Sequence, residues 1–435
     1  MRLPARDPLV TTRSLSEWLL WQEKLHPSAI DLGLDRVRRT LARLSWQAPR
    51  CPVITVGGTN GKGSTVALLR RMLSVAGYRV GTFTSPHLIR YNERITIAER
   101  EVSDASLVAA FERIDAARGD DTLTFFEFNT LAALLIFETA NLDAMVLEVG
   151  LGGRLDAVNV IDADLAIISS IGLDHCDWLG ADIESIAAEK AGIMRTARPV
   201  IFGSRTMPNN IEGVARHVGA KLQRLGRDFD WQASAQTWDW RGPRTNHLEL
   251  PMPALHGQTQ LDNAATTLAA LEALQARLPV SRNAIETGLR TVTLPGRFQV
   301  IECDAQWVLD VAHNPDAAAT LAANLRASPE RRPTIALCGV LGDKDLPGIV
   351  APLADSFDGC VAVELQGSRA RPIDHFAADL RKLGMNVLAT SPSMAAACER
   401  ALELAGKQGR IVVFGSFLTV GPALEWLSTR CVTSA

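Results

Sequence analysis

The chain has 435 residues, of which 47% are hydrophobic and 21% charged, a balance typical of a globular protein long enough for two or three domains. Its formal net charge of −3 argues against binding nucleic acid or an anionic membrane surface through bulk electrostatics, and no apolar run is long enough to span a bilayer. The N-terminus has no uninterrupted apolar core, so we expect no signal peptide.

Seven cysteines are scattered through the sequence, and no two of them form a CxxC pair. An odd number of isolated cysteines argues against a disulfide framework and against a zinc site. Free thiols suit a reducing compartment, so we expect a cytoplasmic protein whose cysteines are mostly small core residues.

The first half of the chain alternates short β-branched runs with amphipathic helical stretches. A strand over 51–58 leads into a helix from Lys62 to about Ala76. Continuous apolar strands that alternate with helices predict a mostly parallel α/β sheet. Further strands are predicted at 78–85, 143–150, 163–172 and 198–204, and helices near 103–118, 126–141 and 182–195.

Residues 229–251 interrupt this alternation, because they are rich in tryptophan and turn formers and predict a small antiparallel hairpin or insert. A Pro-Gly pair within 293–300 then indicates a linker. After the linker the alternation restarts, which predicts a second, smaller α/β domain of normal size. Its expected strands are at 306–312, 333–340, 359–365, 385–390 and 409–416, and helices near 259–276 and 281–291 precede the linker.

The segment VITVGGTNGKGSTVALL, residues 53–69, is similar to a phosphate-binding loop with two of its parts displaced. The usual pattern has a glycine five residues before the Gly-Lys pair and a hydroxyl directly after the lysine, whereas here a valine occupies the first position and Gly63 the second. A glycine-rich turn between a strand and a helix still directs backbone N–H groups at one point, and Lys62 adds a cation. We therefore favour a phosphate site, with Ser64 or Thr65 as the hydroxyl, over a turn that serves packing alone.

Two apolar strands each end close to a residue that could bind a metal ion. Glu148 lies near the end of the strand at 143–150, and His175 follows the strand at 163–172. The ligand of a parallel sheet lies beyond the carboxyl ends of its strands, where a carboxylate can meet Mg²⁺ directly or through water. Alternatively, Glu148 pairs with Arg154 and His175 only makes structural hydrogen bonds, but a buried glutamate needs a partner in either case.

Four polar residues further along the chain are weaker candidates. Lys190 lies in a helix among alanines, where an ion-pair partner at the surface is the simpler interpretation. Asp310 and His313 follow a strand of the second domain, and Arg297 in the linker could contact phosphate. These could equally be surface or capping groups, since Asn-Pro-Asp at 314–316 is a good helix start.

Eight motifs follow one another in the chain: GGTNGKGS, TFTSPHLIRYNERI, LTFFEF, LEVGLGGRLDAVN, GLDHCDWLG, EKAGI, LPGRFQ and DVAHNP. Together they resemble the bacterial folylpolyglutamate synthase/dihydrofolate synthase family of the Mur ligase superfamily, and the resemblance extends from near residue 25 to near residue 420. The first motif alone would also suit the Mur peptidoglycan ligases, whereas TSPHL, FFEF and LEVGLGGRLDA are more specific to the folate enzymes. The family's own loop reads GTNGKGS, which accounts for the displaced hydroxyl.

The resemblance implies an N-terminal P-loop ATPase domain, with a mostly parallel sheet and a small β insert, and a C-terminal Rossmann-like α/β domain. The implied domains are 1–295 and 296–435, with the active site in the cleft between them. Lys62, Lys190 and His313 are the implied catalytic residues, of which Lys190 matches a lysine that becomes carbamylated and His313 lies near the incoming glutamate. By motif, the ligands are Gly61, Lys62, Gly63, Ser64, Asn263, Arg297 and Asp310 for ATP, and Ser85, Glu148 and His175 for Mg²⁺.

The motifs also imply a dihydropteroate site. Two adjacent phenylalanines offer aromatic faces for a flat heterocycle, and a carboxylate can accept hydrogen bonds from pterin N–H groups. A site of this kind is what the dihydrofolate synthase activity needs, so we expect a bifunctional enzyme. The implied residues are Asp31, Leu32, Gly33, Thr124, Phe125, Phe126, Glu127, Leu155, Asp156 and Ala157.

The implied activity is an ATP-dependent amide ligation, which adds L-glutamate to dihydropteroate and to reduced folates through an acyl phosphate. The implied cofactors are ATP and Mg²⁺, and the expected partners are the small-molecule substrates dihydropteroate, folates and L-glutamate. We expect a monomer that binds neither nucleic acid nor membrane. Two alternatives are a Mur-type ligase for peptidoglycan precursors and a regulatory protein that uses the nucleotide loop as a switch.

Overall fold

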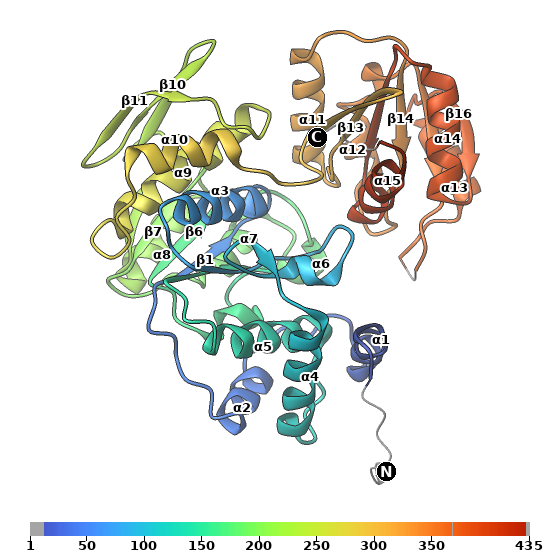
Figure 1. Ribbon diagram of the computed structural model, residues 1–435. Coiled ribbons are helices and arrows are strands. Elements are labelled where there is room, and N and C mark those ends of the chain that lie inside the picture. Colours follow the sequence, from blue (N-terminus) through green and yellow to red (C-terminus); the bar gives the residue numbers. More distant parts are fainter. Residues whose placement is uncertain (1–12, 368, 432–435) are drawn as a thin grey trace.

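Two α/β domains follow one another along the chain in the computed structural model, which describes residues 13–367 and 369–431 (Figure 1). The N-terminal domain, blue to yellow in Figure 1, contains an eight-stranded sheet and a separate three-stranded sheet. The C-terminal domain, orange to red, contains a six-stranded sheet. None of the described helices is both long enough and apolar enough to cross a membrane.

The strands of the large N-terminal sheet lie in the order β4-β3-β2-β5-β1-β6-β7-β8. Neighbouring strands from β2 to β8 are parallel, whereas β3 and β4 form an antiparallel edge. The central strands β1, β5 and β6 are buried along their whole length, because helices cover the apolar side chains on both faces. The strands are β1 (Val53–Gly57), β2 (Val80–Phe83), β3 (Ile95–Ile97), β4 (Arg100–Glu101), β5 (Ala144–Glu148), β6 (Leu165–Ile168), β7 (Pro199–Phe202) and β8 (Lys221–Arg224).

Two sets of helices cover this sheet. On one face α3 and α9 pack against apolar side chains of the sheet, with α10 packed on α3, and on the other face α5 and α7 do so, with α4 packed on α5 and with α1 and α2 packed on α4 and α5. Local sequence sets where they begin: Thr124 and Glu127 form a reciprocal capping box at the start of α5. The helices are α1 (Leu15–Leu25), α2 (Asp35–Arg43), α3 (Lys62–Val75), α4 (Asp104–Arg118), α5 (Phe125–Glu138), α6 (Cys176–Leu179), α7 (Ile183–Ala191), α8 (Asn210–Val218), α9 (Gln258–Leu274) and α10 (Arg282–Thr291).

The tryptophan-rich segment forms the expected antiparallel insert, a small sheet with the strand order β11-β10-β9. Trp238 and Trp240 alternate along β10 and are both buried, as the period of a strand requires. The indole of Trp240 donates to the carbonyl of Ala265 in α9 at 3.1 Å, which attaches the insert to the domain core. The strands are β9 (Asp230–Ala233), β10 (Thr237–Arg241) and β11 (Asn246–Pro251).

The sheet of the C-terminal domain has the order β12-β13-β17-β14-β15-β16, and only β12 and β13 are antiparallel. Helices α11, α12 and α13 cover one face, and α14 and α15 cover the other. This layered arrangement confirms the expected Rossmann-like α/β fold. The elements are β12 (Gln299–Cys303), β13 (Ala305–Leu309), α11 (Pro315–Ala327), β14 (Thr334–Cys338), α12 (Leu346–Val350), β15 (Gly359–Val363), α13 (Ile373–Lys382), β16 (Val387–Ser391), α14 (Met394–Ala405), β17 (Arg410–Phe414) and α15 (Phe417–Arg430).

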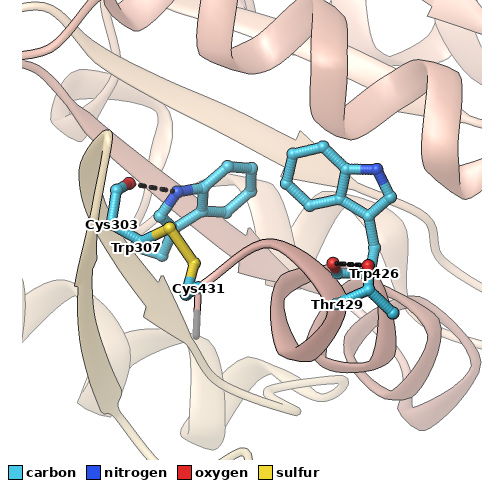
Figure 2. The surroundings of a disulfide bond; sticks show 5 residues. All are labelled: Cys303, Trp307, Trp426, Thr429 and Cys431. Carbon is cyan, nitrogen blue, oxygen red and sulfur yellow. Dashed lines mark hydrogen bonds between the residues drawn. A yellow bond between two sulfur atoms is a disulfide. The ribbon is translucent and has the colours of Figure 1, made fainter. Parts of the chain in front are cut away.

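A disulfide bond joins Cys303, at the end of β12, to Cys431, directly after α15 (Figure 2). The two Cα atoms are 5.8 Å apart although the residues are 128 positions apart in the sequence. Nearby, the ring of Trp307 lies 5.5 Å from that of Trp426, which packs α15 against β13. The expectation of free thiols is therefore wrong for these two cysteines, because tertiary packing and not local spacing brings them together. The free cysteines are Cys51, Cys176, Cys338, Cys360 and Cys398.

Candidate active site

A glycine turn joins β1 to α3 and forms the candidate phosphate-binding loop. Gly58 and Gly61 have φ angles of 141° and 86°, which favour glycine. A Cβ atom on Gly58 would lie 2.1 Å from Ser169 Oγ, so no other residue fits there without movement of that side chain. The loop ends at the N-terminus of α3, where free backbone N–H groups and the helix dipole favour an anion.

The segment after β6 fixes this loop. The backbone N–H of Thr59 donates to the carbonyl of Ser170 at 2.7 Å, and the N–H of Asn60 donates to Ser170 Oγ at 3.1 Å. The hydroxyl of Thr59 donates to the carbonyl of Gly172 at 3.1 Å. These bonds hold the loop in one conformation, which is the preorganisation that stabilises developing negative charge.

Two lysines, the half-buried Lys62 and the buried Lys190, converge on the carbonyl of Gly58. Lys62 Nζ donates to Gly58 O at 2.9 Å and to Thr59 O at 3.0 Å, and Lys190 Nζ donates to Gly58 O at 2.9 Å. Burial lowers the pKa of Lys62, and burial together with the charge of Lys62 lowers the pKa of Lys190 to about 7. The surface interpretation of Lys190 is therefore wrong, because α7 places this side chain inside the site.

The two hydroxyls that follow Lys62 differ in their surroundings, although both are buried in the first turn of α3. Thr65 Oγ1 donates to the carbonyl of Gly61 at 3.0 Å, which commits it to the helix backbone. Ser64 makes no side-chain hydrogen bond among the described residues, so its hydroxyl remains free for a ligand. Of the two hydroxyls that the sequence left open, the geometry favours Ser64.

Glu148 ends β5 at the centre of the sheet and is 5% exposed. One of its oxygens accepts the backbone N–H of Ser85 at 3.2 Å, and burial raises its pKa. Within the described part of the chain Glu148 has no ion-pair partner, because Arg154, the alternative partner, pairs with Glu189 at 2.7 Å. A buried carboxylate without a cation, beside a serine, fits the oxygen ligands of a divalent metal ion.

His175 begins the short helix α6 with a left-handed backbone, at a φ angle of 54°. Its Nε2 lies 3.9 Å from a carboxylate oxygen of Asp174. In residues 13–367 and 369–431 no group of three or more His, Cys, Asp and Glu side chains could hold a metal ion. A metal ion at Glu148 or at His175 would therefore need further oxygen ligands, such as a serine hydroxyl or substrate phosphate oxygens, as Mg²⁺ commonly has in nucleotide sites.

Two side chains outside the loop reach it from α9 and from the linker. The Oδ1 atom of Asn263 would lie 2.5 Å from a Cβ on Gly61, and a guanidinium nitrogen of Arg297 would lie 3.9 Å from a Cβ on Gly63. The guanidinium of Arg297 lies 5.2 Å from the centre of the Phe417 ring. Burial lowers the pKa of Arg297, and this cation has no ion pair among the described residues. An unpaired, partly buried arginine beside this loop suits a phosphate group.

Asp310 and His313 occupy the turn that follows β13. The two oxygens of Asp310 accept the backbone N–H groups of Phe298 and Ala312, each at 2.9 Å, which connects the linker to the end of the strand. Burial raises the pKa of Asp310. His313 Nδ1 lies 2.8 Å from the carbonyl of Val311, and burial lowers its pKa to about 4, so that its ring is neutral near pH 7.

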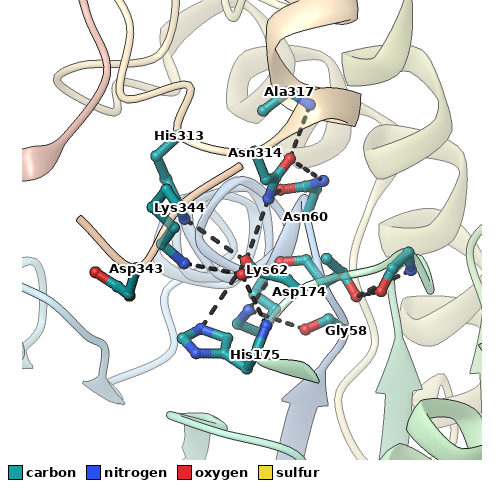
Figure 3. Close-up of polar contacts among 12 residues, drawn as sticks. Gly58, Asn60, Lys62, Asp174, His175, His313, Asn314, Ala317, Asp343 and Lys344 are labelled. Carbon is teal, nitrogen blue, oxygen red and sulfur yellow. Dashed lines mark hydrogen bonds and ion pairs between the residues drawn. The ribbon is translucent and has the colours of Figure 1, made fainter. Parts of the chain in front are cut away.

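The two domains meet at the phosphate-binding loop (Figure 3). Asn60 and Asn314 exchange side-chain hydrogen bonds of 3.1 and 3.2 Å, and Asn314 also caps α11 by accepting the N–H of Ala317. Asp174 accepts Lys344 Nζ at 2.8 Å. Lys344 was not identified from the sequence as a residue of this site. It follows a buried strand of the second sheet as His313 does, so the rule that ligands lie beyond the carboxyl ends of strands could have found it.

The candidate pterin residues form a second group around Arg36. Its guanidinium donates to Asp31 at 2.7 Å and to both oxygens of Glu127 at 3.1 and 3.2 Å. Glu127 also accepts the backbone N–H of Thr124 at 2.8 Å. Glu127 is thus already paired and connects α2 to the start of α5, while Leu32 and Gly33 belong to the loop before α2.

Phe125 and Phe126 begin α5 and are both partly exposed. Phe126 lies 5.7 Å from the ring of Phe83 and contacts the backbone at Gly150, where a Cβ would lie 2.6 Å from its ring. Phe125 lies 5.5 Å from the guanidinium of Arg94. The two rings therefore have fixed positions between β2, the segment after β5 and α5.

Asp156 caps the turn Ala157–Val160, which packs against α2 and α5. It is buried, accepts the backbone N–H groups of Leu151 and Val158 at 2.8 and 3.1 Å, and lies between Leu155 and Ala157. Burial raises its pKa to about 7, and Lys62 and Lys190 lie within electrostatic range of it. A carboxyl group that is half protonated near neutral pH can both donate and accept a hydrogen bond.

Comparison with protein families gives two matches. Residues 56–203 match the Mur ligase middle domain, and residues 296–417 match the glutamate ligase domain of Mur ligases. The chain is 42% identical to the dihydrofolate synthase/folylpolyglutamate synthase of Escherichia coli strain K12 over 416 residues, which cover 96% of each chain. It is 31% identical to the protein of the same name from Mycobacterium tuberculosis, over 97% of this chain and 95% of that protein.

Solved structures show the same likeness. Escherichia coli FolC in complex with DHPP and ADP aligns with a TM-score of 0.91 and 43% identity, over 96% of this chain and 98% of that chain. A bifunctional folylpolyglutamate synthase/dihydrofolate synthase with Mn, AMPPNP and L-glutamate bound aligns with a TM-score of 0.88 and 41% identity, with the same coverage.

Proposed function

Because the chain belongs to the dihydrofolate synthase/folylpolyglutamate synthase family, which is built from Mur ligase domains, we propose that it uses ATP to join L-glutamate to dihydropteroate and to reduced folates. The observation that carries this function is the meeting of the two domains at one loop. Asn60, which lies in the loop two residues before Lys62, bonds directly to Asn314, next to His313. A nucleotide phosphate on the loop and an amino acid on the C-terminal domain would therefore be neighbours.

The reaction needs activation because an amine does not displace oxide from a carboxylate. The substrate carboxylate attacks the γ-phosphorus of ATP, the bond to the β-phosphate oxygen breaks, and ADP leaves. The α-amino nitrogen of glutamate then attacks the carbonyl carbon of the acyl phosphate, phosphate leaves, and the amine loses its proton. Most of the catalysis in such a transfer consists of positioning the substrates and neutralising phosphate charge.

The phosphate-binding loop is suited to that neutralisation. Lys62 donates only to backbone carbonyls, and it can exchange these weak acceptors for phosphate oxygens of opposite charge. Gly61, Gly63 and Ser64 add backbone and hydroxyl donors at the start of α3, and Arg297 adds a second cation. For the rest of ATP we assign Asn263 and Asp310, which border the same loop and linker.

We assign a divalent cation to Ser85, Glu148 and His175, where it would supply charge neutralisation for the phosphate oxygens. The buried, unpaired carboxylate of Glu148 supports the assignment. Lys190 also fits the carbamylation that the family resemblance implies, since that reaction needs an uncharged amine and the pKa of Lys190 is about 7. A carbamate there would place a negative charge beside Lys62.

For the pterin we assign the region between the loop before α2, the start of α5 and the turn at Asp156. Phe126 offers an aromatic face, and Asp156 offers the carboxyl group that can bond to pterin N–H groups. Glu127 would hold the neighbouring elements in place and would not contact the pterin itself, because its oxygens are already bonded to Arg36 and Thr124. The remaining residues assigned to this site are Asp31, Leu32, Gly33, Thr124, Phe125, Leu155 and Ala157.

We further propose a domain boundary between residues 295 and 296, and a monomer that acts in the cytoplasm and binds neither nucleic acid nor membrane. The formal net charge of −3 supports the absence of a nucleic acid partner. The disulfide between Cys303 and Cys431 opposes the cytoplasmic assignment, since disulfides are rare in reducing compartments. Trapping free thiols in intact cells before lysis would show whether the two cysteines are reduced there.

The deciding experiment offers purified protein ATP, Mg²⁺ and labelled L-glutamate with dihydropteroate or tetrahydrofolate in separate reactions. We expect ADP release and amide formation with both acceptors. A UDP-linked muramoyl acid is the control, because stimulation by that compound alone would favour a peptidoglycan ligase. Nucleotide binding without amide formation would instead indicate a regulatory protein and overturn the proposed activity.

A further inference from the structure

One carboxylate of the N-terminal domain is held mainly by groups of the C-terminal domain. One oxygen of Asp174 accepts Lys344 Nζ at 2.8 Å, and the other accepts Asn314 Nδ2 at 3.3 Å (Figure 3). The side chains of Asp174 and Lys344 are only 11% and 9% exposed. The contact therefore joins an acidic side chain of one domain to a basic side chain of the other, and both are nearly buried.

The position of this pair relates it to the reaction. Asp174 lies in the segment after β6 whose earlier residues fix the phosphate-binding loop, and it directly precedes the candidate metal ligand His175. Lys344 lies in the loop between β14 and α12, next to the turn that carries His313, whose Nε2 is 3.8 Å from Asp174. The pair thus connects the phosphate-binding loop to the turn that carries His313, near which we place the incoming glutamate.

We propose that Asp174 and Lys344 are positioning residues that form an interdomain lock. The lock holds the C-terminal domain at the position relative to the phosphate-binding loop that glutamate transfer needs. The inference rests on the proposed function. A neutral pair, Asn60 and Asn314, also joins the domains, but a nearly buried ion pair is costly to break on one side and therefore favours a single arrangement. Misplacement of the reacting groups by about 1 Å can lower the rate about 100-fold.

Two alternative roles for Asp174 and Lys344 would give different experimental results. If Asp174 only orients His175, its loss would weaken metal binding, whereas the loss of Lys344 would not affect catalysis. If the pair only adds stability, its loss would lower the melting temperature without a selective effect on kcat. The lock requires that each substitution lower kcat, that the two effects overlap, and that metal affinity stay the same.

The test is a double-mutant cycle on the full chain, with Lys344→Met, Asp174→Asn and the double variant. Each single variant should lower kcat about 10- to 100-fold. The KM for ATP should change less than about threefold, since the lock aligns the bound groups and does not hold them. The double variant should have a kcat within about threefold of the worse single variant, because both substitutions remove the same contact. Lys382→Met is the matched control, since Lys382 pairs at 3.4 Å with Asp379 on an exposed face of the same domain.

Three measurements without turnover accompany the cycle. With AMPPNP and Mn²⁺ present, small-angle scattering should give both single variants a larger radius of gyration than the wild type, and proteolysis within linker residues 292–298 should be faster. Mn²⁺ affinity, measured by electron paramagnetic resonance, should match the wild type in Lys344→Met. Lys344→Arg should have a higher kcat than Lys344→Met. That result would show that a positive charge at position 344 is enough to restore part of the contact with Asp174.

Four results would each overturn the lock. Two concern kcat: a value for Lys344→Met within threefold of the wild type, or a double variant in which the effects of the two substitutions multiply. The other two are a loss of Mn²⁺ affinity in Asp174→Asn alone, and scattering and proteolysis that are unchanged in both single variants. If the wild type itself showed no ligase activity, the proposed function would fail, and the scattering and proteolysis experiments would still decide the lock.

Discussion

The phosphate side and the pterin side of the site both contain charged residues, but they differ in how the charges are paired. On the phosphate side Lys62, Glu148 and Arg297 have no ion pair among the described residues, although each is buried or partly buried. On the pterin side Arg36 pairs with both Asp31 and Glu127, at 2.7 and 3.0 Å. Since an unpaired buried charge costs folding free energy, the phosphate side is built for ligands of opposite charge and the pterin side for its own rigidity.

The largest effect that would sharpen this comparison is expected for Lys62→Ala. Removal of the central cation should lower kcat on the order of 10³-fold, because the loop loses its main charge for the transferred phosphate. The melting temperature should change by less than about 3 °C, since Lys62 bonds only to two loop carbonyls. ADP release and scanning calorimetry would measure the two quantities, with Lys382→Ala as the exposed control. Near-normal turnover would remove Lys62 from the mechanism.

Glu148→Gln should have the next largest effect, about 100-fold on kcat, through weaker binding of the divalent cation. The same substitution should leave the free energy of unfolding unchanged or raise it, because burial already disfavours the charged form of Glu148. Mn²⁺ titration and urea unfolding would measure both. A variant that lost stability but kept its metal affinity would show that Glu148 serves the fold, and the two sides would then not differ as described.

Arg36→Met should reverse this pattern on the pterin side. It leaves the buried Glu127 without its cation and should lower the free energy of unfolding by about 3 kcal/mol. The KM for dihydropteroate should rise, while kcat at saturation should fall less than about threefold. Arg39→Met is the control, since Arg39 pairs with Asp121 at an exposed position and should cost less than about 1 kcal/mol. Equal losses in the two variants would contradict the structural part assigned to Arg36.

The smallest effect concerns two neutral histidines near the phosphate side. Burial lowers the pKa of His87 and of His313 to about 4, and His87 Nδ1 accepts a hydrogen bond from Arg94 at 2.8 Å. The unfolded chain has a histidine pKa near 6.5, so it takes up protons between about pH 6.5 and pH 4 while the folded protein does not. Stability should therefore be fully present above pH 6.5 and decline through that window. Urea unfolding at pH 7.5, 6 and 5 should show a shallower decline for His87→Gln than for the wild type.

Local patterns in the sequence predicted much of the phosphate side. Alternating runs located the strand that ends at Glu148 and the strand that precedes Asp310, and the glycines around Lys62 identified the loop. These features depend on residues close in sequence, because glycine is needed at positive φ angles and apolar runs at buried strands. The short strands β3, β4, β8 and β12 were not predicted, since a run of a few residues gives no clear period. The helices α1 and α2 were also missed, although Val37 and Leu41 of α2 are buried on one helical face and that spacing could have identified the helix.

Contacts between segments that are distant in the chain could not be predicted from local sequence patterns. The carboxylate of Asp174 meets Lys344 across 170 positions, and nothing near either residue indicates the other. Lys190 was placed at the surface because its helix pattern is compatible with either location, and only the packing of α7 under the loop decides between them. Glu127 was expected to face a ligand, but Arg36 already occupies it. The residue types were visible in the sequence, whereas their partners depended on topology.

The bond between Cys303 and Cys431 has a mechanical consequence. A force applied to the two ends of a tethered molecule would pass from Cys431 through the sulfur bridge to Cys303 and on into the linker, so the sheet between them would carry no load. Extension would then unravel only the N-terminal domain. A reducing agent would expose the shielded segment and release roughly 400 Å of additional contour length, at about 3.4 Å per residue.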